Sequence, residues 1–309
     1  MLGAGVIGLT TAFRLRERGL SVAIWSRDDT LQTTSALAGA IWYPFLAQPR
    51  DRVLAWSKAT FAELQRLAKQ PGTGVHMHPV VEVFDGEPDL WWRDAAPSIE
   101  RLAAADVPPP HRSAIRVDVP VCEVPVYLPW LREQVRALGV AFVTREVASL
   151  DEAFAAADVV VNCTGLGAAA LCGDDQLVPV RGQLVVKQRV PLAHAWIDDT
   201  TPIPRYLVPR ADGIVCGGTA QHGDGSLEPR DEDSRDIVAA LTGPFPQLAD
   251  AAVQKVTVGL RPYRSTVRLE RGERPDGGLL VHNYGHGGSG YTMAWGCADE
   301  VCALVSAAR

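Results

Sequence analysis

Three glycines near the start of the chain place narrow limits on its fold. Residues 3–8 read Gly-Ala-Gly-Val-Ile-Gly, which has the spacing G-x-G-x-x-G, and residues 9–16 continue with a helical pattern. In such a loop the first glycine permits a tight turn, the second lets the backbone approach a pyrophosphate, and the third lets helix and strand pack closely. Unpaired N–H groups at the helix start then bind the phosphates. The run predicts a dinucleotide site, with an ordinary strand-to-helix turn as the alternative.

The residues on either side of this helix bear on the same prediction. Residues 20–25 are predicted to form a strand, and Arg27 and Asp28 follow it directly. An acidic or polar group about 20 residues beyond the glycines is expected to contact a ribose hydroxyl. Only Met1 and Leu2 precede the glycines, whereas a strand usually has about five residues. We therefore expect the first strand to be very short or to start upstream of Met1.

Composition and charge exclude several classes of function. The net charge of −6 argues against a nucleic acid or an anionic membrane as partner, since both select a basic face. No apolar run reaches the roughly 18 residues of a membrane span. The six cysteines form no C-x-x-C pair, which favours a reduced, cytoplasmic protein with buried thiols. His76 and His78 lack a cysteine or acidic pair at ligand spacing, so we predict no metal site.

The order of the predicted elements indicates an α/β fold built from separated segments. Residues 1–50 and 126–178 contain strand and helix patterns of one open sheet, and the strand at 159–165 ends in small and polar residues, where such sheets bind ligands. From residue 180 short strands alternate with turns, including a hairpin turn at 210–213. Further helices are predicted at 52–70, 129–138, 234–241 and 291–306, further strands at 80–85, 140–143, 183–187, 206–209, 214–219, 256–261 and 279–284, and little regular structure at 86–125.

A second glycine-rich run, residues 285–290, precedes the last predicted helix. Its backbone N–H groups and the positive end of the helix dipole suit a negative charge that develops on a ligand. A flexible loop before a terminal helix is the simpler alternative. Ser289 is a rival candidate as a nucleophile, but that motif requires G-x-S-x-G, and Tyr291 stands where the last glycine is needed.

Arg261, at the end of an apolar strand, is the best candidate for binding an anion. Burying a guanidinium without an anion is costly, and its planar fork matches a carboxylate; a surface ion pair is the alternative. Arg264 is an odd number of residues away and should face the opposite side of an extended strand. Tyr206 is either a core residue or a phenolic donor into a pocket, and its surroundings in the sequence favour the core.

Together these segments resemble the D-amino-acid oxidase family of flavoproteins, which is related to D-aspartate oxidase and glycine oxidase. The strongest match is at residues 281–292 with 295–298 behind it, and residues 39–44, 161–165, 206–209, 216–219 and 259–262 follow the family's order. The resemblance covers nearly the whole chain. It implies FAD as the cofactor and oxidative deamination of D-amino acids, with hydride transfer from Cα to flavin N5 and O2 as the acceptor that yields hydrogen peroxide.

The resemblance also implies roles for individual residues. Arg261, helped by Tyr206, is expected to bind the substrate carboxylate, the carbonyl of Gly288 to receive the amine, and Tyr43 to shape the pocket, with no side chain acting as acid or base. The residues expected at FAD are Gly3, Gly5, Val6, Ile7 and Gly8 in the first loop, Arg27 and Asp28 at the ribose, Thr34, Ser35, Gly39, Ala40 and Ile41 along the pyrophosphate and flavin, Val147 at the adenine, and Gly287, Gly288, Gly290, Tyr291 and Thr292 at the isoalloxazine.

The implied architecture is a Rossmann-like FAD-binding domain with a mixed or antiparallel β-sheet substrate domain. We assign residues 1–50, 126–178 and 276–309 to the first and residues 51–125 and 179–275 to the second. The family's lid before Tyr206 is short here, at residues 198–203, and lacks a tyrosine.

Other functions and partners stay open at this point. D-Aspartate oxidation would need a second cation in the pocket, for which Arg205 and Arg264 are the local candidates. Glycine oxidation and a non-catalytic flavin- or NAD-binding module are the remaining alternatives. The expected partners are a small D-amino acid and O2, and a homodimer is left open.

Overall fold

The computed structural model describes residues 1–45, 47–273 and 277–307. Its helices are α1 (Val6–Glu17), α2 (Arg50–Leu67), α3 (Val124–Ala137), α4 (Leu150–Phe154), α5 (Gly167–Cys172), α6 (Asp231–Thr242) and α7 (Gly290–Ser306). Its strands are β1 (Ala23–Ser26), β2 (Val75–Phe84), β3 (Ile99–Arg101), β4 (Ser113–Cys122), β5 (Ala141–Thr144), β6 (Val159–Asn162), β7 (Val178–Lys187), β8 (Ala195–Asp198), β9 (Arg205–Arg210), β10 (Gly213–Gly217), β11 (Gln221–His222), β12 (Val253–Gly272) and β13 (Leu279–His286).

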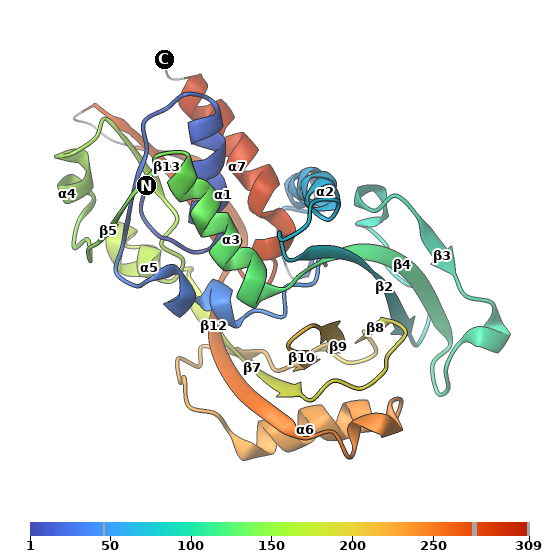
Figure 1. Ribbon diagram of the computed structural model, residues 1–309. Helices are drawn as coiled ribbons and strands as arrows, with labels where there is room; N and C mark the ends of the chain where they lie inside the picture. The colour runs from blue at the N-terminus through green and yellow to red at the C-terminus, as the bar shows by residue number, and fades with distance from the viewer. Residues whose placement is uncertain (46, 274–276, 308–309) are drawn as a thin grey trace.

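All the described strands except β11 follow one path from the β5 end of the molecule to the β3 end, and β11 pairs with β7 beside this path (Figure 1). β1 pairs with β5, and Leu2 bridges Trp25 of β1 to Asn162 of β6. From β6 the order is β13, β12, β7, β10, β9, β8, β2, β4 and β3. The β1–β5, β6–β13 and β2–β8 pairs are parallel, whereas β12 pairs antiparallel with both β7 and β13. The predicted α/β class with a mixed sheet is confirmed.

Leu2 takes the place of the first strand. Its N–H donates to the carbonyl of Val161 at 2.9 Å, and the N–H of Gly3 donates to the carbonyl of Trp25 at 2.8 Å. These bonds hold the first glycine between β1 and β6. Within the described residues, Leu2 alone joins the two strands and positions the loop.

Two predicted elements on the substrate side differ from the structure. The region 86–125 contains the ten-residue strand β4, in which the exposed residues Arg116 and Asp118 alternate with buried neighbours. Pro120 interrupts this alternation of exposed and buried residues, so the sequence did not predict the strand. β2 begins at Val75, so His76 and His78 lie on a strand rather than in a loop. In the described part of the chain no group of three or more metal-binding side chains comes together.

Two further elements are longer than predicted. α3 begins at Val124 because Pro125 occupies the first turn, where its missing N–H costs no helical hydrogen bond. Pro129, the predicted start, lies inside the helix. β12 runs from Val253 to Gly272 instead of ending near residue 261. Its pairing register shifts between Tyr263 and Arg268, and this irregularity breaks the period that marks a strand in sequence.

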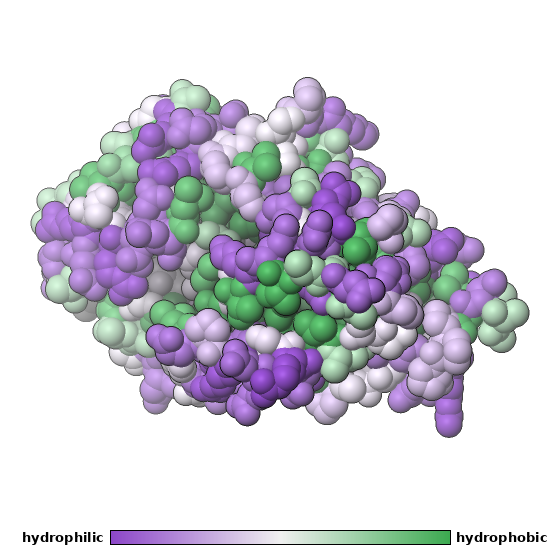
Figure 2. Space-filling view, turned by 60° about the horizontal axis from the view of Figure 1, so that its bottom comes forward, coloured by the Kyte–Doolittle hydropathy of each residue, from purple (hydrophilic) through white to green (hydrophobic). Residues whose placement is uncertain are grey.

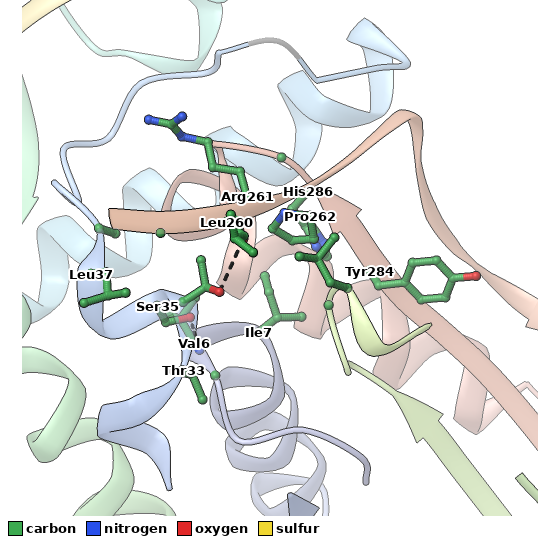
Figure 3. Close-up of a pocket in the computed structure, with 18 of the residues that line it drawn as sticks. Val6, Ile7, Thr33, Ser35, Leu37, Leu260, Arg261, Pro262, Tyr284 and His286 are labelled. Carbon is green, nitrogen blue, oxygen red and sulfur yellow. Dashed lines mark hydrogen bonds between the residues drawn. The ribbon is translucent and has the colours of Figure 1, made fainter. Parts of the chain in front are cut away.

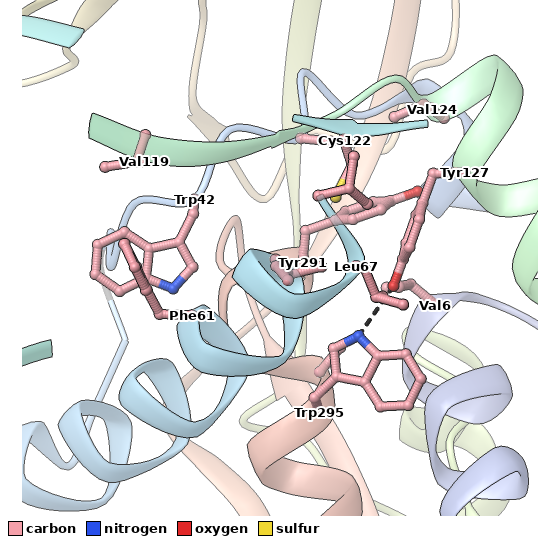
Figure 4. Close-up of a cluster of buried hydrophobic side chains, with 14 of the residues drawn as sticks. Val6, Trp42, Phe61, Leu67, Val119, Cys122, Val124, Tyr127, Tyr291 and Trp295 are labelled. Atoms are coloured by element: carbon pink, nitrogen blue, oxygen red, sulfur yellow. Dashed lines mark hydrogen bonds between the residues drawn. The ribbon is translucent and has the colours of Figure 1, made fainter. Parts of the chain in front are cut away.

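Helices α1, α2, α3 and α7 pack on one another on one side of the sheet, and α6 lies on the other side, against β7 (Figure 1). A Cβ at Gly296 of α7 would lie 2.3 Å from the carbonyl oxygen of Trp56, so α7 and α2 pack too closely for any side chain there. In the same core Trp295 donates from Nε1 to Tyr127 Oη at 3.0 Å (Figure 4). This packing fixes both glycine loops to one helical layer.

The predicted domain division stays a prediction, and two elements cross it. β12 pairs with β7 of the substrate side along one half and with β13 along the other. α2, which we assigned to the substrate domain, packs on α7. Residues 275 and 276, the last predicted boundary, lie outside the described residues. One face of the molecule carries apolar surface in its middle, between hydrophilic residues (Figure 2). None of the described helices is long and apolar enough to cross a bilayer.

Candidate active site

A cavity of about 1020 Å³ opens between the first glycine loop, the segment 32–45, the inner strands and the second glycine loop. Of the residues expected at the cofactor, its wall contains Gly3, Gly5, Val6, Ile7, Arg27, Asp28, Thr34, Ser35, Gly39, Ala40, Ile41, Val147, Gly287, Gly288, Gly290 and Tyr291. Of those expected at the substrate, it contains Tyr43, Tyr206, Arg261 and Gly288. Gly8 and Thr292 lie outside this wall. The structure thus brings nearly all of the predicted residues to one cavity, while their contacts with ligands remain predictions.

The first glycine loop leaves its backbone uncovered toward the cavity. A Cβ on Gly5 would lie 3.0 Å from Ser35 Oγ, so the second glycine keeps the approach open. The N–H of Val6 donates to that same hydroxyl at 3.0 Å (Figure 3). The first turn of α1 contains no acidic residue, so its positive dipole end faces the cavity without a competing anion. These features suit a phosphate group.

Arg261 supplies a guanidinium to the cavity from the middle of β12. Its Nη1 donates to the carbonyl of Thr219 at 2.8 Å, and its side chain extends away from Ile7 and Ser35 (Figure 3). A Cβ on Gly182 would lie 2.3 Å from Nη1, so the arginine depends on the missing side chain of that glycine. In the described part of the chain no carboxylate lies within ion-pair distance of Arg261. Its remaining N–H groups are available for an anionic ligand.

Arg264 points to the opposite side of β12, as the alternation predicts. Its Nε donates to Asp174 Oδ2 at 3.0 Å, outside the cavity wall. Asp174 also accepts a hydrogen bond from Tyr284 Oη at 2.8 Å. Arg264 is therefore a structural ion-pair partner.

Tyr206 lies in the cavity wall and also packs against the buried cluster, so it occupies both of the positions that its local sequence left open. A Cβ on Gly217 would lie 2.2 Å from Tyr206 Cζ, and one on Gly39 would lie 3.3 Å from Cε2. These glycines make room for the ring. Burial raises the pKa of Tyr206, and nearby Arg261 acts in the opposite direction. The phenol is protonated at neutral pH and can donate a hydrogen bond.

Comparison with known proteins identifies the family. The family model described as FAD dependent oxidoreductase matches residues 2–304. The chain belongs to this FAD-dependent oxidoreductase family. It is 43% identical to the D-amino-acid oxidase of Rubrobacter xylanophilus, covering 100% of this chain and 95% of the relative, and 34% identical to the human D-aspartate oxidase, covering 99% and 94%. Glycine oxidase from Geobacillus kaustophilus has the same fold, with a TM-score of 0.84 at 19% identity over 99% of this chain and 93% of that one.

FAD is the cofactor of this family member, and the cavity fits it. Besides the glycine loop, the wall offers a buried polar atom in need of a partner: His286 Nε2 has no hydrogen bond within the described residues. Burial lowers the pKa of His286 to about 3, so the ring is neutral. The flat, largely apolar stretch from Gly39 to Ile41 lies on the same wall. A planar ring system with polar edges suits these surroundings.

Gly8, predicted at the cofactor, packs against the first loop and lies outside the cavity wall, and its cofactor role stays a prediction. A Cβ there would lie 2.0 Å from the carbonyl oxygen of Gly3, inside the turn rather than in the cavity. Because Gly8 has no side chain, α1 can pack closely against the short segment that takes the place of the first strand.

We expect Gly8→Ala to lower the free energy of unfolding by about 1–3 kcal/mol, because the loop backbone must shift to admit the methyl group. FAD affinity should fall with it. Gly243→Ala is the matched control, since Gly243 has αR dihedral angles and nothing within 4 Å of an added Cβ. Urea unfolding and FAD titration measure both effects. Equal behaviour of the two variants would contradict the packing role.

Two hydroxyls at the start of α7, one on the residue before the helix and one in its first turn, hold the cavity segment 43–45. Ser289 Oγ donates to the carbonyl of Phe45 at 2.7 Å and accepts from its N–H at 2.8 Å. Thr292 Oγ1 donates a hydrogen bond to the carbonyl of Tyr43 at 2.9 Å and accepts one from the N–H of Tyr43 at 3.1 Å. The side chain of Thr292 therefore holds Tyr43, and Thr292 lies outside the described cavity wall. Its place at the isoalloxazine stays a prediction. Ser289 is fully buried, which excludes it as an accessible nucleophile.

Glu82 is a residue near the site that the sequence did not single out. It lies on β2 with 1% of its surface exposed, and Tyr43 Oη donates to its Oε1 at 2.5 Å. Burial, opposed by the Tyr43 hydrogen bond and reinforced by Asp199, raises the pKa of Glu82 to about 8. The carboxyl is therefore mostly protonated at neutral pH. An acidic residue inside the apolar run 80–84 was the signal available in the sequence.

Proposed function

We propose that the chain oxidises D-amino acids, converting a D-amino acid, O2 and water to a 2-oxo acid, ammonia and hydrogen peroxide. The observation that carries this proposal is the position of Arg261, a guanidinium without a carboxylate partner among the described residues, in a cavity whose other end fits FAD. Relatives named D-amino-acid oxidase from Rubrobacter xylanophilus and Streptomyces coelicolor are each 43% identical over at least 99% of this chain.

In this proposal the protein binds and orients, because FAD supplies the redox chemistry by accepting a hydride from the substrate and passing electrons to O2. Arg261 binds the substrate carboxylate through two parallel N–H bonds, and Tyr206 donates a third bond from its protonated phenol. The carbonyl of Gly288, in the wall beside Arg261, accepts the amine. Holding both ends of the substrate fixes the direction of its Cα–H bond, which lowers the entropic part of the barrier.

For the cofactor we propose the assignments made from the sequence, with Gly8 supporting the first loop and Thr292 supporting the backbone of Tyr43, both from outside the cavity wall. The N–H groups of Val6 and Ile7 and the hydroxyls of Thr34 and Ser35 surround the pyrophosphate. Arg27 and Asp28, a 2.8 Å ion pair at the rim of the cavity, face the ribose, and Val147 faces the adenine. The isoalloxazine lies against Gly39, Ala40 and Ile41, with Gly287, Gly288, Gly290 and Tyr291 at its pyrimidine edge.

D-Aspartate oxidation is disfavoured by the positions of the two candidate cations. Arg205 donates to the carbonyl of Gly218 at 2.7 Å, and Arg264 is paired with Asp174. Neither lies in the cavity wall. A carboxylate side chain would instead approach the buried acid Glu82. The likeness to glycine oxidase is a likeness of fold.

The test is anaerobic reduction of the purified protein. We expect flavin absorption bands that bleach with D-alanine, persist with L-alanine, and return on admission of air with formation of hydrogen peroxide. L-Alanine serves as the matched control because it offers the same carboxylate and amine with the opposite configuration. Flavin that stays oxidised with D-alanine, D-valine and D-phenylalanine would refute the oxidase.

The cellular setting and the assembly remain predictions. Five of the six cysteines are buried and Cys172 is half-buried, and all six are free thiols, as expected for a reduced, cytoplasmic protein. A homodimer likewise stays a prediction, which the molar mass in solution would test.

A further inference from the structure

A row of paired residues leads across the sheet from the carboxylate end of the cavity to Glu82. Tyr206 on β9 is paired with Ile197 on β8, and Ile197 with Glu82 on β2. Directly paired residues of neighbouring strands face the same side of a sheet. All three side chains therefore face the cavity side, and Glu82 lies two strand spacings, or about 10 Å, from Tyr206.

The side chains next to Glu82 in its row are apolar, Tyr43 is its hydrogen-bond partner, and the carboxylate of Asp199 is near enough to act on it electrostatically. In the same row its other neighbour is Ile115 on β4. Both isoleucines belong to the buried cluster against which Tyr43 and Tyr206 pack. In this setting a carboxyl needs a hydrogen-bond partner, and the hydroxyl of Tyr43 provides it at 2.5 Å. The bond joins the sheet to a residue of the cavity wall.

Tyr43 is held from three directions. Thr292 of α7 bonds its backbone N–H and carbonyl, the ring packs edge-on against Trp92 with centroids 5.9 Å apart, and Glu82 accepts from its hydroxyl. Only the last of these contacts fixes the tip of the side chain. The tip is the part that a substrate side chain would meet when its carboxylate lies at Arg261 and Tyr206.

We propose that Glu82 is a positioning residue that determines substrate specificity by holding Tyr43 as the end wall of the side-chain subsite. The proposal rests on the proposed function and names its substrate class: D-amino acids with short, uncharged side chains. With the wall in place, a long side chain must break the Tyr43–Glu82 bond or leave the carboxylate site. Loss of the bond lets the ring swing and lengthens the subsite.

The experiment compares kcat and KM for D-alanine and D-phenylalanine in the FAD-loaded wild type, Glu82→Gln and Glu82→Leu. Leucine removes the acceptor, and we expect the ratio of kcat/KM for D-phenylalanine to that for D-alanine to rise about tenfold, through a lower KM for D-phenylalanine. Glutamine keeps a carbonyl acceptor, and the ratio should stay within about twofold of the wild type. Ile115→Val, in the same row but without a bond to Tyr43, controls for a general loosening of the sheet and should also leave the ratio unchanged.

Tyr43→Phe provides a second reading if Glu82→Leu fails to fold, because it keeps the ring and removes the bond. A raised ratio in this variant supports the proposal. An unchanged ratio in Glu82→Leu or Tyr43→Phe, with D-alanine still oxidised and flavin still bound, overturns the role of Glu82 alone. A wild type that oxidises no D-amino acid overturns the proposed function and this proposal together, so the two failures are distinguishable.

Discussion

Replacing Arg261 with alanine should lower kcat/KM for D-alanine by about 30-fold to several thousand-fold. The variant removes a charge-assisted, bidentate contact to the substrate carboxylate, and loss of one partner of such a buried pair costs about 2–5 kcal/mol. Neither of the neighbouring arginines can take its place, since Arg205 and Arg264 are bonded elsewhere. Most of the loss should fall on KM if the contact is equally strong in the ground and transition states. Steady-state peroxide formation measures it.

Arg264→Ala is the matched control for this prediction. It removes the same side chain three residues along β12 but from the opposite face, where the partner is Asp174. We expect kcat/KM to stay within about threefold of the wild type. Arg261→Lys keeps the charge without the planar fork and should fall between the two. An Arg261→Ala enzyme with near-normal kcat/KM would show that the carboxylate binds elsewhere.

The second large effect concerns the pH dependence of stability. Glu82 has an ordinary pKa of 4.5, and burial raises it to about 8 in the folded protein. Between these values the folded state binds a proton that the unfolded state has released. The contribution of Glu82 is therefore fully present below pH 4.5 and is lost as the pH rises to about 8. Linkage gives about 1.4 kcal/mol per pH unit across this window, or several kcal/mol in total.

Comparison of the wild type with Glu82→Gln isolates this contribution, because glutamine does not titrate. Urea unfolding with saturating FAD at pH 5, 7 and 9 should show the wild type losing stability relative to the variant at each step. The neighbouring Asp199, whose pKa burial also raises, is common to both proteins and cancels. A stability difference that is constant across this range would mean that Glu82 is not protonated in the folded state.

Local patterns in the sequence were sufficient for the parts of the site made by consecutive residues. The glycines at 3–8 predicted the phosphate loop because their missing side chains are required within a single turn. Arg261 stood out because a charge at the end of an apolar strand needs a partner. Strand alternation also placed Arg264 on the other face, as the structure shows. In each case the deciding geometry spans only a few residues.

The failures have an equally physical cause. β4 was missed because Pro120 interrupts its pattern, and most of β12 was missed because a register shift breaks its period. The sequence also did not show that the Cβ position of Gly8 faces the Gly3 carbonyl or that the Thr292 hydroxyl bonds the Tyr43 backbone. A sequence motif identifies the region of the site, and tertiary packing determines the direction in which each side chain of the motif points.

The sequence by itself was sufficient for the family and for FAD through the resemblance that its motifs carry, and residue type and short spacing singled out the two glycine loops and Arg261. Only the tertiary structure decided how the substrate end is built. The room for Arg261 comes from Gly182, and the wall at Tyr43 comes from Glu82 and Thr292. Thr292 and Tyr43 are 249 residues apart. Strand register and helix packing bring such residues together, and neither can be read from the spacing of residues along the chain.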